Sequence, residues 1–378
     1  MANNLKYEKK VLNIEQKNFA QEIKVFLNKY QITQKELSLR LHLSIKHINS
    51  ILNNEIKRIS ASVLDNLEYV LKLPFGSLTR LYHEHIALNE VQNISNVEQQ
   101  LREYGIDYIS DHPELFLRYG VLIEKNMPLY KKMMQMKKFY GVSILSDYFK
   151  YLDVHALADA TKYTQRPNSI VWIRLCENCI NFENLYIGTF RKNGFELCFK
   201  KVLNYMNSNE YSIFERLEKI KEFLYSKGIV LVLKPFIENS YIKSITIKKG
   251  GKRYIFLSDM LNTEPLIFFA LLHELVHCYF PNFNEEQIDK KVISQYRKWE
   301  KNHKSNYKAI YDAINYINVV APWSENEKNG KPLDEITKQH LLSLLQKNYE
   351  YVTFEDKTYD EKNECEEKLN DNTKKIML

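Results

Sequence analysis

The stretch TEPLIFFALLHELVHCYFP, residues 263–281, contains the strongest pattern in the chain. Thr263 suits a helix N-cap and Pro281 stops a helix, so we expect one strongly apolar helix between them. His273 and His277 are four residues apart and therefore lie on one face of this helix, where both imidazoles can reach a single metal ion.

Glu274 completes the motif HELVH between the two histidines. Zinc makes a bound water acidic, and Glu274 is placed to take its proton and pass it to the leaving amine of a cleaved peptide. A pair of buried structural histidines is the alternative, but it leaves an unpaired carboxylate in an apolar helix. The motif therefore predicts a Zn2+ site with His273 and His277 as ligands and Glu274 as the catalytic residue of a metallo-endopeptidase.

A third protein ligand is expected on the next helix, which Asn284 caps. Its first turn carries Glu285 and Glu286, and Asp289 follows one turn later. Glu285 is the first choice. Glu285 and Asp289 are i,i+4 neighbours, so one of them can bind the metal while the other orients a ligand. Glu286 and Asp289 stay open as ligands, and acidic residues also suit the start of any helix.

The residues before the motif predict a small sheet. GIVLVL, at 228–233, is a continuous apolar run rich in β-branched residues and predicts a strand. Residues 241–247 and 253–257 flank a Gly250-Gly251 turn and predict a hairpin.

Over about residues 220–296 this arrangement resembles the ImmA/IrrE metallo-endopeptidases, in which a helix carrying HExxH follows a small sheet. The matching parts are the GIVLVL strand, the hairpin, the HELVH helix and EEQIDKKV at 285–292. The resemblance implies the family's roles for His273, Glu274 and His277. The chain differs from the family in a shorter stretch before the acidic helix and in Ile288, where members have a small residue.

A second pattern lies at residues 31–58, QITQKELSLRLHLSIKHINSILNNEIKR. It predicts two short helices joined by a tight turn, with Thr33 and Ser44 as N-caps. Leucine and isoleucine recur at helical spacing and are expected to point inward at Leu37, Leu41, Ile48 and Leu52.

Residues 20–82 resemble the XRE-type helix-turn-helix of phage repressors and HigA-type antitoxins. His42 replaces the usual turn glycine, and histidine tolerates a positive φ. Residues 1–80 hold thirteen Lys and Arg against seven Asp and Glu, so +6 of the net +7 lies there and favours DNA binding. We expect phosphate contacts from two residues of the first helix and base contacts from the start of the second: Gln34 and Lys35, then Ser44, Ile45, Lys46, His47 and Ser50.

The composition sets the fold class. With 44% hydrophobic and 27% charged residues, the chain is globular over most of its length. Only 10 Gly and 9 Pro in 378 residues favour long helices over sandwiches and barrels. We predict an α+β, mostly helical protein in which an N-terminal helix-turn-helix bundle precedes a zincin-like peptidase domain with a small sheet.

Four segments are predicted: a DNA-binding domain at 1–90, a helical connector at 91–165, a peptidase domain at 166–300, and a C-terminal helical region at 301–378 that includes a charged tail at 355–371. The longest apolar stretch, Leu266–Leu272, is too short to span a bilayer. Five cysteines without a regular framework suit a reducing compartment, so we expect a cytoplasmic protein that does not enter a membrane.

These patterns lead to one functional hypothesis and one alternative. The hypothesis is a regulator that binds double-stranded operator DNA as a homodimer and cleaves a partner repressor or antitoxin with zinc. The alternative is a non-enzymatic regulator or HigA-like antitoxin, whose peptidase-like domain only senses or binds a partner such as a toxin.

Overall fold

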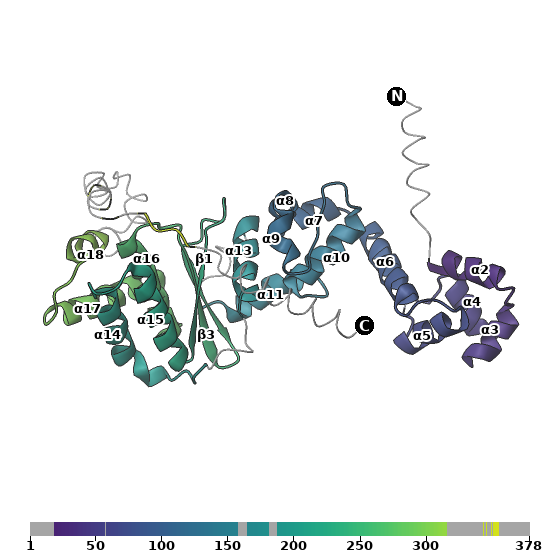
Figure 1. Ribbon diagram of the computed structural model, residues 1–378, viewed down its shortest axis with the longest axis horizontal. Coiled ribbons are helices and arrows are strands. Elements are labelled where there is room, and N and C mark those ends of the chain that lie inside the picture. The colour runs from purple at the N-terminus through teal and green to yellow at the C-terminus, as the bar shows by residue number, and fades with distance from the viewer. Residues whose placement is uncertain are drawn as a thin grey trace, which may run out of the picture. The chain divides into compact units, whose positions relative to one another are not determined.

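The computed structural model describes residues 19–315 apart from 57, 158–164 and 181–186, together with 343, 345, 349 and 351–354. Figure 1 shows the course of the chain. The predicted charged tail at 355–371 lies outside the described residues, as does most of the predicted C-terminal helical region beyond residue 315.

The chain forms two compact units. The first comprises the chain up to Leu101 and the stretch Leu122–Met136. The second comprises Arg102–Val121 and the chain from Lys137 onward. The four segments expected from the sequence are not tested by this division and stay predictions.

The first unit is helical. Its core is shared by helices α2 to α6, and the four residues predicted to point inward, Leu37, Leu41, Ile48 and Leu52, are all buried there. Its helices are α2 (Phe19–Lys29), α3 (Gln34–Leu41), α4 (Ile45–Leu52), α5 (Ala61–Val70) and α6 (Ser77–Gln92), and α7 (Val97–Glu103) and α10 (Leu129–Tyr140) begin in this unit and end in the second.

A tight turn joins α3 to α4. Both helices begin after the predicted N-caps, Thr33 and Ser44, whose side-chain oxygens accept hydrogen bonds from the third residue of each helix at 3.2 and 3.1 Å. His42 adopts the left-handed conformation, with φ 53°, as predicted. The Ser38 hydroxyl donates to the Leu43 carbonyl at 2.6 Å and fixes the turn.

The second unit contains the remaining helices. Helix α15 ends at Ser226, two residues before Gly228, which has a positive φ of 75°. The helices are α8 (Ile106–Asp111), α9 (Pro113–Leu117), α11 (Ser146–His155), α13 (Pro167–Asn178), the short 3-10 helix η1 (Lys192–Gly194), α14 (Phe195–Met206), α15 (Ile213–Ser226), α16 (Glu264–Tyr279), α17 (Glu285–Glu300) and α18 (Lys308–Asn315).

The predicted strand and hairpin form one mixed sheet from β1 (Ile229–Lys234), β2 (Ser244–Lys249) and β3 (Lys252–Ser258). The strand order is β1-β3-β2, with β3 parallel to β1 and antiparallel to β2. Gly250 and Gly251 turn the hairpin with φ angles of +56° and +74°, a conformation that glycine adopts without strain.

Helices cover both faces of this sheet. Figure 1 shows α14 to α17 on one side and α11 and α13 on the other. On the first side α16 contacts both β2 and β3, and α15 contacts β1. The packed residues between these layers are fully buried, among them Leu231, Ile255, Leu257, Leu271 and Leu275.

The fold is therefore α+β and mostly helical with a small sheet, as predicted. Within the described ranges, no helix combines the length and the hydrophobicity needed to cross a bilayer.

A buried carboxylate joins α5 to α6 in the first unit. Glu68 has no exposed surface. Its two oxygens accept hydrogen bonds from three backbone N–H groups at the start of α6: Gly76 at 2.7 Å, Leu78 at 2.7 Å and Thr79 at 3.2 Å. The side chain thus satisfies donors that a helix start leaves unpaired and places a negative charge at the positive end of the helix dipole.

We predict that Glu68→Ala lowers the free energy of unfolding of the first unit by about 2–4 kcal/mol, because an unsatisfied buried donor costs about 1–3 kcal/mol. Urea titration of the full chain, followed by far-UV circular dichroism, measures the change. Asp65→Ala is the control, since Asp65 is an exposed carboxylate on the same helix. Equal losses in the two variants would contradict the capping role.

Candidate functional site

The two predicted histidines lie in the last two turns of α16. Their Nε2 atoms are 3.1 Å apart. His277 is 2% exposed, and its Nδ1 has no hydrogen-bond partner among the described residues. Its polar contacts in that part of the chain are made through Nε2, the nitrogen that faces His273.

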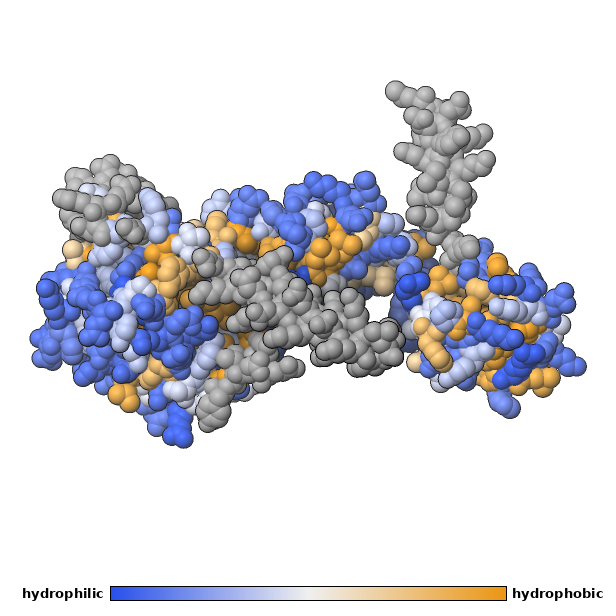
Figure 2. Space-filling view, viewed as in Figure 1, coloured by the Kyte–Doolittle hydropathy of each residue, from blue (hydrophilic) through white to orange (hydrophobic). Residues whose placement is uncertain are grey.

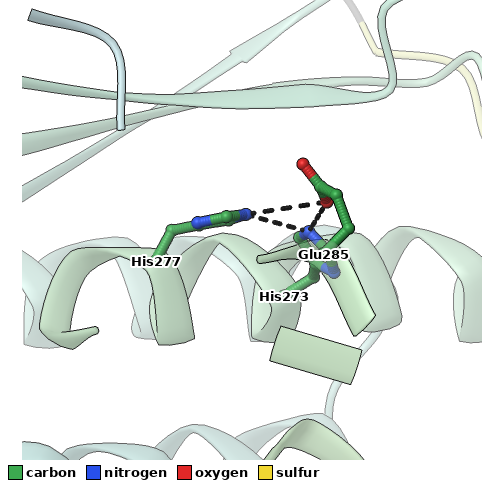
Figure 3. A group of neighbouring side chains, drawn as sticks. All are labelled: His273, His277 and Glu285. Atoms are coloured by element: carbon green, nitrogen blue, oxygen red, sulfur yellow. Dashed lines mark hydrogen bonds and ion pairs between the residues drawn. The ribbon is translucent and has the colours of Figure 1, made fainter. Parts of the chain in front are cut away.

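The acidic helix α17 supplies the third side chain. Asn284 and Gln287 form a capping box, in which Asn284 Oδ1 accepts from the Gln287 N–H at 2.8 Å and Gln287 Oε1 accepts from the Asn284 N–H at 3.0 Å. This cap begins the helix at Glu285. Glu285 Oε2 lies 3.0 Å from His273 Nε2 and 3.8 Å from His277 Nε2. Figure 3 shows the three side chains pointing toward one another.

The structure separates the three acidic candidates. Glu286 forms an ion pair with Lys290 on the exposed surface of the same helix. Asp289 Oδ1 lies 2.8 Å from Nδ1 of His273, the ring nitrogen that faces away from the other two donors. Glu285 is thus the carboxylate that joins the histidines, and Asp289 holds one of them in orientation.

The three donor atoms are spaced for one metal ion. A tetrahedral ion with bonds of about 2.0–2.1 Å keeps its ligand atoms about 3.3 Å apart. The observed separations are 3.0, 3.1 and 3.8 Å. Two imidazoles and a carboxylate bind several divalent metals, so this donor set does not by itself select zinc.

The same carboxylates control the proton on His273. Burial lowers its pKa, but hydrogen bonds to Asp289 and Glu285 and the nearby charge of Glu274 raise the pKa to about 10. Without a cation, the ring therefore carries a proton on each nitrogen at neutral pH. The carboxylates of Asp289 and Glu285 then accept hydrogen bonds from these two N–H groups. A bound cation would replace the proton on Nε2.

Glu274 lies beside this group but points at the sheet. It is 4% exposed. Its Oε1 accepts a hydrogen bond from the Ser244 hydroxyl at 2.8 Å, and its Oε2 accepts one from the Thr246 hydroxyl at 2.5 Å. The carboxylate in the apolar helix is therefore paired, with two hydroxyl donors on β2.

Ser244 and Thr246 were not predicted as site residues. Their signal was present, because serine and threonine alternate with isoleucine in SITI at 244–247 and so share one face of the strand. That face could not be assigned to Glu274, which is 28 residues beyond Thr246, before the packing of α16 on β2 was known.

In the first unit, the residues predicted to contact DNA lie at the surface of α3 and α4. Gln34, Lys35, Ser44, Ile45 and Lys46 are exposed, and His47 and Ser50 are partly exposed. Figure 2 shows hydrophobic and hydrophilic residues side by side on the visible face of this unit. The exposed hydrophobic residues include Leu39 and Ile45.

Comparisons of the chain with protein-family models, with curated proteins and with solved structures found no match. The resemblances to ImmA/IrrE peptidases and to XRE-type helix-turn-helix proteins stay predictions. The case for a function therefore rests on the side chains and their geometry.

We predict that the full chain binds about one zinc ion and that Glu285→Ala weakens binding at least tenfold, because it removes one of three converging donors. Isothermal titration of metal-stripped protein with Zn2+ measures the affinity. Glu286→Ala is the matched control, since Glu286 is the neighbouring residue that pairs with Lys290 instead. If Glu286→Ala weakens binding as much as Glu285→Ala, the assignment of the third ligand is wrong.

Proposed function

We propose that this chain is a DNA-binding regulator with a metal-dependent endopeptidase, and that it cleaves a partner repressor or antitoxin with Zn2+. The observation that carries the proposal is the convergence of His273, His277 and Glu285 beside Glu274, the arrangement that metal-assisted peptide hydrolysis needs. The resemblance of this segment to ImmA/IrrE peptidases points to the same chemistry.

Each side chain then has one task. Nε2 of both histidines and Oε2 of Glu285 would hold the metal ion, which when bound would supply Lewis-acid chemistry to a water and to the peptide carbonyl. Glu274 takes the proton of the attacking water on its carboxylate and delivers it to the leaving amine nitrogen. Asp289 keeps Nε2 of His273 directed at the site by accepting a hydrogen bond from Nδ1.

One observation favours the non-enzymatic alternative. Both oxygens of Glu274 already accept hydrogen bonds from hydroxyls of β2, and the side chain is almost fully buried. A regulator that only binds a partner would use such a carboxylate to fasten α16 to the sheet. The alternative and the peptidase differ in what Glu274 must do in the presence of a substrate.

We predict that the zinc-loaded chain cleaves members of a proteome-derived peptide library and that Glu274→Gln lowers the rate at least a hundredfold, the usual contribution of a general base. Mass spectrometry of the cleaved peptides measures both. Zinc content should be unchanged in this variant, and Glu286→Gln should cleave at the wild-type rate. Cleavage by Glu274→Gln at the wild-type rate contradicts the mechanism, and no cleavage by the wild type favours the non-enzymatic regulator.

DNA binding is supported by the first unit. Its two capped helices and left-handed turn place the start of α4 at the surface, and its local charge is positive. We infer that α4 enters the major groove and that a homodimer reads two half-sites, because such operators mirror the symmetry of the protein.

We predict that Lys46→Ala and His47→Ala each weaken binding to DNA about tenfold or more, because a good base contact is worth about 1–3 kcal/mol. The probe is the duplex that the full chain enriches from a random DNA library, and fluorescence anisotropy measures affinity at fixed salt. Lys72→Ala is the control, since Lys72 is exposed in the same unit but lies outside α3 and α4. Unchanged binding by both test variants would contradict this docking.

A further inference from the structure

The outer edge of β2 is partly covered by the chain itself. β2 is the last strand in the order β1-β3-β2, so β3 pairs with one of its edges. Along the other edge, Ala156 forms an antiparallel bridge with Ile247, and the Leu157 N–H donates to the Thr246 carbonyl at 2.9 Å. We call residues 155–157, directly at the end of α11, the edge segment.

A side chain adds to this contact. Nδ1 of His155 lies 2.8 Å from the Lys248 carbonyl, so the ring donates to the same edge of β2. The carbonyl groups of Thr246 and Lys248, which both point away from β3, thus accept hydrogen bonds from the edge segment. The outer edge of a strand can pair with any extended backbone segment. The edge segment pairs with the outer edge of β2 in the antiparallel direction, so this edge accepts such a partner.

Thr246 connects this edge to the candidate site. Its carbonyl accepts the bond from the edge segment, while its hydroxyl donates to Glu274 Oε2 at 2.5 Å. An extended peptide on this edge would therefore be held by the same strand residue that holds Glu274. Ser244, two residues along the strand, holds the other oxygen of that carboxylate.

We propose that the edge segment occupies the strand site of a protein substrate, so that the chain blocks its own docking edge until the segment is displaced. This inference rests on the proposed peptidase function. The partner it implies is an extended, unfolded stretch of polypeptide that pairs with β2 through its backbone. A folded protein without such a stretch would not displace the segment.

The contact is small enough to be displaced. Within residues 155–157, the hydrogen bonds to β2 are the backbone bond from Leu157 and the side-chain bond from His155, beside the single bridge of Ala156 to Ile247. Each such hydrogen bond is worth about a two- to tenfold change in an equilibrium constant. Losing the backbone bond should therefore release the edge measurably without unfolding the sheet, whose other strand pairs are untouched.

Leu157→Pro removes the N–H that donates to Thr246, and Leu157→Ala is the matched control that keeps it. The proline is compatible with the preceding residue, because Ala156 already has extended backbone angles of φ −65° and ψ 140°. Ala156→Cys with Ile247→Cys makes the opposite change, since facing residues of an antiparallel pair are close enough for a disulfide that fastens the segment.

The readout is the binding of fluorescently labelled, reduced and carboxymethylated casein to the zinc-loaded full chain in a Glu274→Gln background, which separates docking from cleavage. We expect Leu157→Pro to bind casein about three- to tenfold more tightly than Leu157→Ala. The oxidised double-cysteine variant should bind more weakly than its reduced form by a similar factor. Equal binding in both pairs overturns the inference and leaves the segment as a mere cover of the edge.

Cleavage of the same casein by these variants with Glu274 intact distinguishes this result from a failure of the proposed function. We expect hydrolysis to rise in Leu157→Pro by the factor found for binding. Tighter binding of casein to Leu157→Pro without any hydrolysis would contradict the proposed peptidase function. Hydrolysis at equal rates in Leu157→Pro and Leu157→Ala would contradict the blocking role of the edge segment.

Discussion

Two imidazole nitrogens and a carboxylate oxygen within 3.8 Å of one another need positive charge between them. A proton on His273 meets this need in part, since hydrogen bonds to Asp289 and Glu285 raise the pKa of the ring although burial lowers it. A divalent cation between these atoms would meet the need with a bond to each of the three. This electrostatic constraint ties side chains from two helices into one site, and the surrounding structure keeps them at that distance.

Two features of the second unit hold the group together. The apolar residues of α16 pack against β2 and β3, so the helix that carries both histidines is fixed by its own core. The capping box of Asn284 and Gln287 starts α17 at the point where Glu285 reaches the histidines. The short connection between α16 and α17 is therefore sufficient to bring Glu285 to the site.

Local sequence patterns predicted the placement of the two histidines and the turn in the first unit. Helix spacing placed His273 and His277 on one face, and the tolerance of histidine for positive φ anticipated the turn at His42. The sequence favoured Glu285 as the third ligand but left Glu286 and Asp289 open, because the choice depends on how α17 is rotated against α16. Ser244 and Thr246 were missed for the same reason, since sheet packing decides which residues face Glu274. Thr263 takes the predicted N-cap position, yet its hydroxyl has no hydrogen-bond partner among the described residues.

The central claim is that three atoms from α16 and α17 bind one metal ion. X-ray absorption at the zinc edge of the full chain, loaded with one equivalent of Zn2+, tests it most directly because it reports the ligand atoms themselves. We expect nitrogen and oxygen ligands alone at about 2.0–2.1 Å, with the outer-shell scattering of two imidazoles. Sulfur at about 2.3 Å, or a zinc ion with fewer than two imidazoles, would contradict it.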